Sequence, residues 1–421
     1  MLGMFALATP DVARRRARPS RALVATPVVA LVLFLSLMAP AGPGTIPGAS
    51  AATWMPTPGV KFNVPREGAK QYILEQQVIG AINHAVKGSY IKMSMFSFDR
   101  WPVADALVNA RGRGVHVQVI TNNHELPPAQ VRLKNRFGTD RTKATFFYQC
   151  TASCRGQGDV NHSKFILFSQ TGAATNVVML GSLNMKRNGT DNQFNDLFTV
   201  NKAYSLHKTL DMVFQQMAAD RWAKPMRLVQ SFGTSYNLEV MPFPKDPVAT
   251  PETEWTPYRD PIIRLLRPVS CKGASTSDGR TKIRVDMHAW DGERGGIIAR
   301  RLKYLYDHGC DVKIMVGFMS KSMRSILFAP TGRGRVPTRS TGYDTDGDGI
   351  IDLYSHKKLT LIHGHYGTAT GKRIVMTGSS NFQNGGQYGD EILFQIYRRS
   401  IYDRYLDNWK WVWDYHTHGM A

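Results

Sequence analysis

Cysteine is scarce in this chain, with four residues in 421. Their spacing matches no zinc-binding pattern, so metal ligation by cysteine is the less favoured interpretation. An even number of cysteines in an exported chain instead favours disulfide bonds. We expect one bond that closes a short loop and one that ties the start of the second half to a strand, Cys150–Cys154 and Cys271–Cys310.

Acidic residues are also few, with 32 Asp and Glu against 53 Lys and Arg and a formal net charge of +21. Such an excess of positive charge favours anionic partners, namely phosphate-bearing lipids, nucleic acid or acidic surfaces. Hydrophobic residues make up 43% of the chain and charged residues 20%, which is typical of a globular protein and excludes a disordered one.

The apolar stretch near the N-terminus, residues 22–37, is short for a membrane span and lacks a stop-transfer flank. An arginine-rich segment precedes it, and Ala49-Ser50-Ala51 follows with the small residues that signal peptidase requires. We therefore expect residues 1–51 to be a cleaved signal peptide and the protein to be secreted and extracellular. A retained membrane anchor is the alternative. Cleavage removes five arginines and one aspartate, so the mature chain stays strongly basic.

The rest of the chain repeats itself. Residues 91–121 and 283–316 both contain a strand, an aromatic-Asp pair, a helix, a glycine and a second strand, in this order. "HSK" at His162 returns as "HKK" at His356, and "GSLN" ending at Asn184 returns as "GSSN" ending at Asn381. Landmarks in one order at a nearly constant offset indicate an internal duplication.

Each copy predicts an α/β fold. Its strands are nearly continuous apolar runs, as expected when helices cover both faces of a sheet. We expect two α-β-α halves that form an intramolecular pseudo-dimer. The first half spans 52–221 and the second 283–421, with a proline-rich connection at 222–282.

The duplicated motifs suit the cleavage of a phosphodiester. One imidazole attacks phosphorus and forms a covalent phosphoenzyme. The other protonates the leaving oxygen and then deprotonates the incoming water or alcohol. Lysine and asparagine donors from both copies surround the non-bridging oxygens, whose charge rises in the transition state. An acidic residue ten or twelve positions after each Asn can orient an imidazole. No metal is required.

These paired motifs resemble those of the phospholipase D superfamily over nearly the whole mature chain. The resemblance implies that His162 is the nucleophile and His356 the acid/base, although the sequence by itself does not rank the two. Ser182 and Ser379 either bind substrate or only shape their turns. The implied half-sites are His162, Lys164, Ser182, Asn184 and Asp196, and His356, Lys358, Ser379, Asn381 and Glu391.

The chain departs from the family pattern five residues after each motif lysine, where the family has Asp. Ser169 and His363 occupy these places. That Asp supports the structure rather than attacking, so its loss does not exclude activity but argues against close kinship with the best-known phospholipases. Asp196 also replaces the more usual Glu. Three further histidines are interpreted as ordinary polar or packing residues: His84, His124 and His288.

The stretch "DTDGDGIID" fits the opening of a calcium-binding loop, with a glycine at the sharp turn. Position twelve is serine instead of the bidentate Glu, and the alternative is a solvated acidic turn. We expect a calcium ion with a structural role only. Its expected ligands are the side chains of Asp344, Asp346, Asp348 and Asp352 and the backbone carbonyl of Ile350.

The sequence therefore predicts a secreted, monomeric phospholipase D-like phosphodiesterase that cleaves phospholipid headgroups through a phosphohistidine. A C-terminal tryptophan cluster, Trp409 to Trp413, is interpreted mainly as helix core and otherwise as membrane contact. Two alternatives stay open: a nuclease of the same superfamily, whose basic surface neutralises backbone phosphates, and a catalytically weakened binding protein.

Overall fold

The structure is a computed structural model that describes residues 53–156 and 158–420, and these residues belong to one compact unit. The expected signal peptide and its cleavage point lie outside the described residues. Among the described helices, none has the length and hydropathy needed to cross a membrane.

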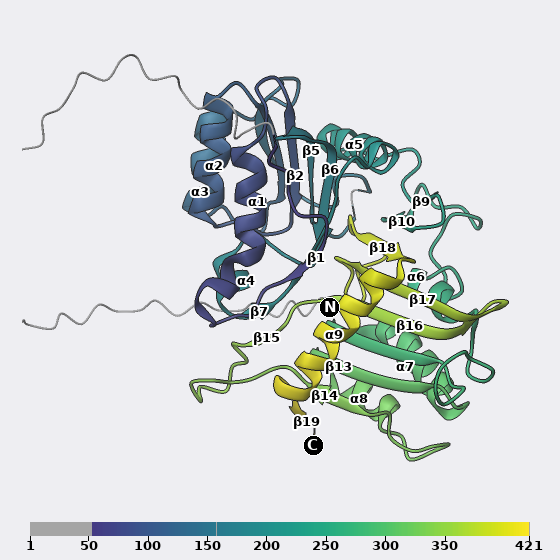
Figure 1. Ribbon diagram of the computed structural model, residues 1–421. Helices are drawn as coiled ribbons and strands as arrows, with labels where there is room; N and C mark the ends of the chain where they lie inside the picture. The colour runs from purple at the N-terminus through teal and green to yellow at the C-terminus, as the bar shows by residue number, and fades with distance from the viewer. Residues whose placement is uncertain (1–52, 157, 421) are drawn as a thin grey trace, which may run out of the picture. The chain divides into compact units, whose positions relative to one another are not determined.

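The first half of the described chain forms a mixed sheet of seven strands in the order β1-β8-β6-β5-β2-β3-β4 (Figure 1). Strands β2, β3 and β4 pair in parallel, and the other pairs are antiparallel. The strands are β1 (Gly59–Phe62), β2 (Tyr90–Met95), β3 (His116–Asn122), β4 (Phe146–Cys150), β5 (Phe165–Thr171), β6 (Ala174–Gly181) and β8 (Asp196–Val200).

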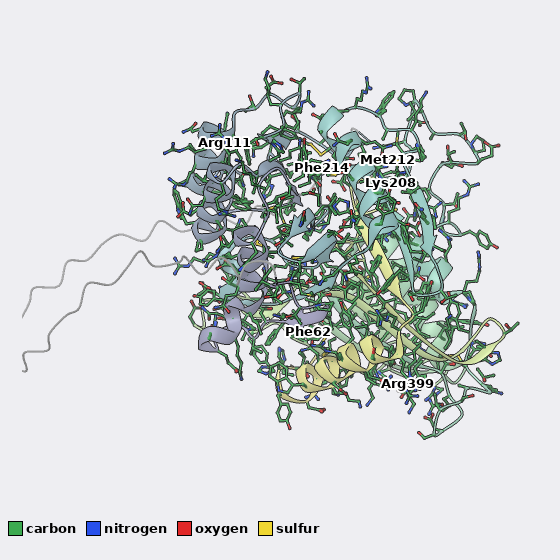
Figure 2. All side chains as sticks on the ribbon, turned by 45° about the horizontal axis from the view of Figure 1, so that its top comes forward. Phe62, Arg111, Lys208, Met212, Phe214 and Arg399 are labelled. Carbon is green, nitrogen blue, oxygen red and sulfur yellow. A yellow bond between two sulfur atoms is a disulfide. The ribbon has the colours of Figure 1, made fainter. Side chains whose placement is uncertain are left out.

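Helices cover both faces of this sheet, which explains why its strands are apolar on both sides. Helices α1 (Ile73–Asn83), α2 (Trp101–Gly112) and α3 (Pro128–Phe137) share one hydrophobic core with β2 and β3. Helix α5 (Tyr204–Ala219) packs on the other face, where Phe214 is fully buried while Met212 is 40% exposed (Figure 2). The short elements η1 (Gly68–Tyr72), α4 (Arg187–Asp191) and β7 (Gln193–Phe194) complete this half.

The second sheet has ten strands among the described residues, in the order β19-β14-β13-β12-β16-β17-β18-β10-β9, with β11 paired to β16. Helices α6 (Pro261–Leu266), α7 (Gly292–Asp307), α8 (Lys321–Leu327) and α9 (Arg399–Tyr415) accompany it. The strands are β9 (Leu228–Phe232), β10 (Tyr236–Val240), β11 (Val269–Ser270), β12 (Lys282–Trp290), β13 (Asp311–Met319), β14 (Thr338–Ser340), β16 (Lys358–Tyr366), β17 (Ala369–Gly378), β18 (Ile392–Ile396) and β19 (His418–Gly419). A separate pair joins β15 (Tyr354–Ser355) to β7.

The two sheets repeat one strand order. The run β10-β18-β17-β16-β12-β13-β14 matches β1-β8-β6-β5-β2-β3-β4 strand for strand, with the same parallel and antiparallel pairs. This agreement is what an internal duplication produces, and the expected α/β fold is confirmed. It also shows that residues 222–282 are more than a connection, because they supply β9, β10, α6 and β11.

A single hydrophobic cluster joins the two halves. It contains Phe165 and Phe198 from the first sheet, Val375 and Phe394 from the second, and Trp409 from α9. The rings of Phe198 and Phe394 lie 5.9 Å apart. The halves therefore share buried apolar surface, which fixes the position of one set of strand ends relative to the other.

Both expected disulfides are confirmed. Cys150–Cys154 closes a loop after β4, and Cys271–Cys310 ties the segment after β11 to the start of β13. The backbone N–H of Cys154 donates a hydrogen bond to the Asp390 carboxylate at 2.5 Å, so the first disulfide loop also holds the second half of the chain.

Candidate active site

His162 stands just before β5, at a point where the two halves exchange backbone hydrogen bonds. Asn161 forms a parallel bridge with Asp390, and the His162 N–H donates to the Asp390 carbonyl at 3.0 Å. This brings the next residue, Glu391, to the imidazole, and His162 Nδ1 lies 2.9 Å from Glu391 Oε1. Because Nδ1 donates to the carboxylate, the lone pair of the neutral ring is on Nε2, which points away from Glu391.

Glu391 is buried and held in place by the turn of the second Gly-Ser-x-Asn motif. Ser379 Oγ donates to Glu391 Oε2 and accepts the Ile392 N–H at 2.9 Å. Burial acts to raise the pKa of Glu391, but His162 and Lys164 outweigh it and the pKa is lowered. The carboxylate is therefore ionised beside His162, and Ser379 orients it.

His356 occupies the matching position before β16. Its N–H donates to the Phe194 carbonyl at 3.0 Å, after the parallel pair of Ser355 with Phe194. Its Nδ1 lies 3.0 Å from the Ser182 carbonyl and 3.0 Å from Asn195 Oδ1. Both of these acceptors are uncharged. The two imidazoles therefore have the same backbone setting but different partners, a carboxylate for His162 and neutral oxygens for His356.

Asn195, rather than Asp196, is the structural counterpart of Glu391. Ser182 Oγ lies 3.0 Å from Asn195 Oδ1, in the same way that Ser379 Oγ donates to Glu391. Asp196 is one residue further along the strand. Because successive side chains of a strand point to opposite faces, a shift of one residue moves Asp196 away from the imidazole.

Asp196 instead serves the packing between the halves. Its Oδ2 accepts hydrogen bonds from Thr377 Oγ1 at 2.6 Å and from the Tyr405 hydroxyl at 2.7 Å. Its Oδ1 accepts the Ser182 N–H at 3.2 Å. The structure thus differs from the expected half-site, in which Asp196 orients an imidazole. Asp196 is buried and contacts Ser182, Thr377 and Tyr405 instead of His356.

The two motif lysines are almost completely buried, with Lys164 2% and Lys358 4% exposed. Lys164 Nζ donates to the His162 carbonyl at 2.6 Å, and Lys358 Nζ donates to the His356 carbonyl at 2.7 Å. Burial lowers the pKa of Lys164 to about 7 against the opposing charge of Glu391. Burial, and then the charge of Lys164, lowers the pKa of Lys358 well below its usual range. An anion bound here would restore both charges.

The charged residues of each half-site affect the pKa of the histidine in the other, so the two half-sites lie in one region. Burial, together with the charges of Lys164 and Lys358, lowers the pKa of His162 to about 4 against the opposing effect of Glu391. Burial likewise lowers the pKa of His356 well below its usual range, with contributions from Lys358, Lys164 and His162. Both rings are therefore neutral at neutral pH, and a neutral imidazole is the form that can attack phosphorus.

The two motif asparagines have different neighbours, Ser97 for Asn184 and His288 for Asn381. Asn184 Oδ1 accepts the Ser97 N–H at 3.4 Å, which leaves the amide NH₂ as the donor end of this side chain. Asn381 lies beside His288 and acts to raise the pKa of that ring, against the larger effect of burial, which lowers it. These amides can supply neutral donors for the oxygens of a phosphate.

His288, which the sequence suggested to be an ordinary packing residue, lies in the site. Its ring centroid is 4.4 Å from that of His356 and 5.3 Å from the stacked ring of Tyr354. In the repeated strand order it corresponds to Phe96, whose ring packs edge-on against His162 at 4.9 Å. Together with Asn195 it is a site residue that sequence reasoning missed. An alignment of the two strands, which pairs His288 with Phe96, could have indicated it.

The other two histidines stay outside the imidazole pair. His124 stacks on Phe96 at 4.1 Å, and its Nε2 lies 3.1 Å from Ser97 Oγ. His84 stacks on Trp54 at 4.1 Å. The residues that replace the motif Asp are also remote from the imidazoles, because they lie further along β5 and β16. Ser169 Oγ accepts the Tyr90 N–H, and His363 packs near Tyr402.

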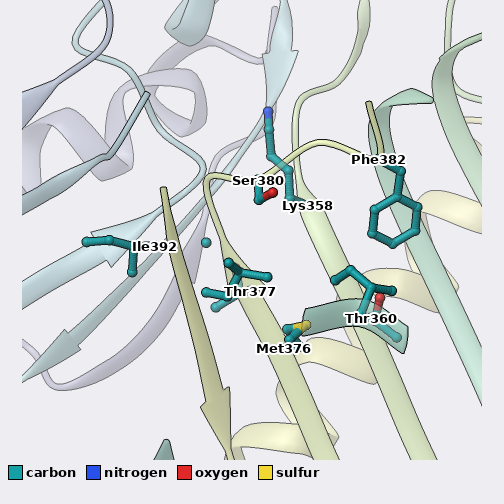
Figure 3. A pocket seen from close by; sticks show the side chains of 10 residues that line it. Lys358, Thr360, Met376, Thr377, Ser380, Phe382 and Ile392 are labelled. Carbon is teal, nitrogen blue, oxygen red and sulfur yellow. The ribbon is translucent and has the colours of Figure 1, made fainter. Parts of the chain in front are cut away.

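A small cavity lies beside Lys358 between β16, β17 and β18 (Figure 3). Its volume is about 10 Å³, which is room for about one water molecule. Thr360, Thr377 and Ser380 contribute to its wall. It is too small for a substrate, whereas the His162 side chain is 12% exposed.

The acidic loop gathers three of its four aspartates. Oxygen atoms of Asp344, Asp346 and Asp348 lie within 4.8 Å of one another, and all three side chains are exposed. Backbone N–H groups of the loop donate to each of them. Asp352 is engaged elsewhere, with Arg66 at 3.3 Å, and the Ile350 side chain is 52% exposed. The ninth position of the expected calcium loop is therefore separate from the first three ligands.

The C-terminal tryptophans belong to the core. Trp409 is 2% exposed, and Trp411 and Trp413 are partly buried and pack against the cluster that joins the halves. Trp409 Nε1 donates to the Val285 carbonyl at 3.0 Å. This agrees with the helix-core interpretation of the cluster and leaves little of it available to a membrane.

A comparison with known families identifies part of this architecture. The family model described as "Cardiolipin synthase, PLD-like domain" matches residues 78–218. Residues 78–218 form a phospholipase D-like domain. The matched range contains the first His-x-Lys and Gly-Ser-x-Asn motifs, so the resemblance to the phospholipase D superfamily is confirmed. No curated protein matches the sequence.

Two solved structures share their fold with most of this chain, including its second half. The phosphatidylserine synthase of Haemophilus influenzae matches with a TM-score of 0.54 and 12% identity, over 86% of this chain and 87% of that one. The polyphosphate kinase of Porphyromonas gingivalis matches with a TM-score of 0.53 and 13% identity, over 83% of this chain and 49% of that one, so this chain spans about half of the kinase. Nuc of Salmonella typhimurium, a phospholipase D family member, has 18% identity and a TM-score of 0.29, over 38% of this chain and 94% of Nuc. At these identities the likeness concerns the fold alone.

Proposed function

We propose that this chain is a secreted phosphodiesterase of the phospholipase D type, with His162 as nucleophile and His356 as acid/base. The hydrogen bond of His162 to Glu391, a carboxylate from the other half of the chain, is the observation that carries the assignment. Attack by Nε2 leaves a positive charge on the ring, and an adjacent carboxylate stabilises that charge. His356 has only neutral acceptors and lacks this stabilisation.

The reaction follows in two steps. His162 Nε2 forms a bond to phosphorus while the bond to the leaving oxygen breaks, and that oxygen takes a proton from His356. For this step His356 must first gain a proton, which the negative charge of the bound phosphodiester favours. In the second step His356 takes a proton from water, the hydroxide attacks phosphorus and the P–N bond breaks. Lys164 and Lys358 balance the charge on the non-bridging oxygens in both steps.

For the substrate we propose a phospholipid whose headgroup is released. The match to a cardiolipin synthase family model and the shared fold with a phosphatidylserine synthase support a lipid, and the net positive charge supports an anionic surface. Both half-sites lie on one chain, which supports a monomer. A nuclease is the alternative within the superfamily. The presence of both His-Lys pairs disfavours a binding protein without turnover.

Headgroup release from mixed phospholipid vesicles, run beside cleavage of plasmid and single-stranded DNA, tests the proposal. We expect release from vesicles, resistance to chelators, and loss of activity in His162→Asn. The matched control is His84→Asn, which alters a half-buried histidine stacked on Trp54 away from the site. Full activity of His162→Asn would refute the assigned nucleophile, and DNA cleavage without headgroup release would favour the nuclease.

We propose that the protein works outside the cell. Its two disulfides support this location, because such bonds persist in oxidising compartments. N-terminal sequencing of protein recovered from culture medium should begin at Ala52. A secreted product that retains residues 1–51, or no secreted product, would contradict the proposal.

We also propose a structural calcium ion at Asp344, Asp346 and Asp348, whose closely spaced carboxylates favour a bound cation. This ion is separate from the reaction, which requires no metal. The ligand role first expected for Asp352 requires this side chain to leave Arg66.

A further inference from the structure

A groove is lined by residues of the edge strand β9 and of the segment that contains α6. Its volume is about 580 Å³, within the range of roughly 300–1,000 Å³ that is usual for small-molecule sites. Half of its wall is apolar, with Phe243 and Tyr258 as the aromatic side chains. The proposed catalytic residues do not line it, so this groove is distinct from the imidazole pair.

The remaining wall is dominated by arginine. Four guanidinium groups line the groove, and Glu252 is the acidic side chain among the lining residues. Below the wall, Glu239 is 2% exposed and shared by two of the arginines, with Arg227 at 2.7 Å and Arg264 at 3.2 Å. Four positive charges against two carboxylates leave a formal surplus of two.

Glu239 offsets one charge of Arg227 and Arg264, and Glu252 lies near Arg259, so one formal positive charge remains on each pair of arginines. Arg259 Nη1 donates to the carbonyls of Pro251 at 2.6 Å and Glu254 at 3.0 Å, which are uncharged acceptors. Arg267 is exposed and lies over the Tyr258 ring at 3.9 Å, and it forms no ion pair with any described residue. A planar guanidinium placed on an aromatic ring still presents its edge donors to an oxyanion.

We propose that this groove binds an organic phosphate monoester with an apolar tail. The phosphate lies on Arg259 and Arg267, and the tail packs against Val229 and Tyr258, which are 39% and 67% exposed. A phosphate monoester carries about two negative charges at neutral pH, which equals the surplus, whereas a carboxylate carries one. Guanidinium groups bind phosphate oxygens in pairs, so they fix the orientation of the headgroup as well as its charge.

The test must separate this groove from the catalytic lysines, which also attract anions. The titration therefore uses a Lys164→Met, Lys358→Met background whose thermal stability is first checked. The probes are dihexanoyl phosphatidic acid, inorganic phosphate, hexanoate and dihexanoylglycerol, measured by calorimetry. We expect the first to bind at one site and the other three to bind at least about tenfold more weakly, which is 1.4 kcal/mol or more.

Arg267→Glu should weaken the binding of dihexanoyl phosphatidic acid at least about tenfold, while Arg267→Lys keeps most of it. The matched control is Arg111→Glu, an exposed arginine on α2 in the other half (Figure 2). Arg259→Gln gives a second, independent loss.

Equal affinity in Arg267→Glu and Arg111→Glu would overturn the proposal. So would tight binding of dihexanoylglycerol, because the site would then not select an anion. The absence of binding at millimolar concentration in a folded background would also refute it. None of these outcomes depends on whether the imidazole pair cleaves phosphodiesters.

Discussion

Replacement of Glu391 by glutamine tests the assignment of the nucleophile most directly. The amide has nearly the same size, so the backbone contacts between the halves should survive. It removes the charge that faces the His162 ring and allows the ring to adopt the other tautomer. We expect a large loss of turnover with little change in stability.

The size of the loss follows from the geometry. His162 Nδ1 and Glu391 Oε1 are 2.9 Å apart, so the charge centres of the ring and the carboxylate are separated by about 4 Å. Two unit charges at about 4 Å interact by about 4 kcal/mol at an effective dielectric constant of about 20. The proposed phosphohistidine step creates this positive charge on the ring. Since about 1.4 kcal/mol corresponds to tenfold in rate, the expected loss is about a thousandfold in kcat.

Asp196→Asn is the matched control, because it also removes a buried carboxylate in the same region. Asp196 contacts Thr377 and Tyr405 rather than an imidazole, so its replacement should cost stability, about 1–3 kcal/mol, and less than tenfold in kcat. Turnover of bis(p-nitrophenyl) phosphate suits the assay, because this small diester resembles neither a lipid nor a nucleic acid. The measured rate therefore does not depend on which of the two is the natural substrate. Thermal unfolding of each variant supplies the stability.

Glu391→Gln should therefore lower kcat without lowering stability, and Asp196→Asn should do the opposite. A Glu391→Gln enzyme with more than a tenth of the wild-type kcat would refute the role of the carboxylate. A thousandfold loss in Asp196→Asn with unchanged stability would show that Asp196, rather than Asn195, serves the second imidazole.

Three further predictions concern the same molecule. The kcat/KM profile should fall below about pH 4, where His162 gains a proton, and above about pH 7, where Lys164 loses one. In Lys164→Arg the alkaline limb of the profile should move to higher pH. An alkaline limb that does not move would show that another group is responsible for it. Calorimetry should show one calcium ion bound at up to millimolar concentration, lost in Asp346→Asn, with catalysis resistant to EDTA; an absence of binding would leave the loop as a solvated turn. Removal of the Cys150–Cys154 bond by serine at both positions should lower the free energy of unfolding by about 2 kcal/mol for so short a loop, and unchanged denaturation midpoints would contradict this.

The fold could largely be predicted from the sequence because the chain is duplicated, so that each motif in one copy can be checked against the other copy. A pattern that occurs once can arise by chance, but His-x-Lys and Gly-Ser-x-Asn in the same order at nearly the same offset cannot easily do so. The two disulfides followed from cysteine count and position. The strands β9 and β10 were missed because eight prolines in residues 222–268 suggested an irregular connection.

The partner of each imidazole was harder to predict, because strand register decides it. The sequence aligns "NDLFTV" with "DEILFQI" and pairs Asp196 with Glu391, the two residues that share an acidic side chain. In the structure, Asn195 takes the place of Glu391. A shift of one residue along a strand moves a side chain to the other face of the sheet. Pairing Asp196 with Glu391 because both are acidic therefore placed the predicted partner on the wrong face. His288 was missed for a related reason, since its contact with His356 spans strands that are far apart in sequence.

In the proposed mechanism, the differences between the two copies allow one symmetric fold to perform an asymmetric reaction. A nucleophile needs stabilisation of the positive charge that attack creates, and Glu391 supplies it to His162. An acid/base must exchange its proton readily, so a carboxylate that held its charged form would oppose that exchange. Asn195 avoids this by presenting a neutral oxygen to His356. The division of labour therefore resides in the residues that surround the motifs, since the motifs themselves are nearly identical.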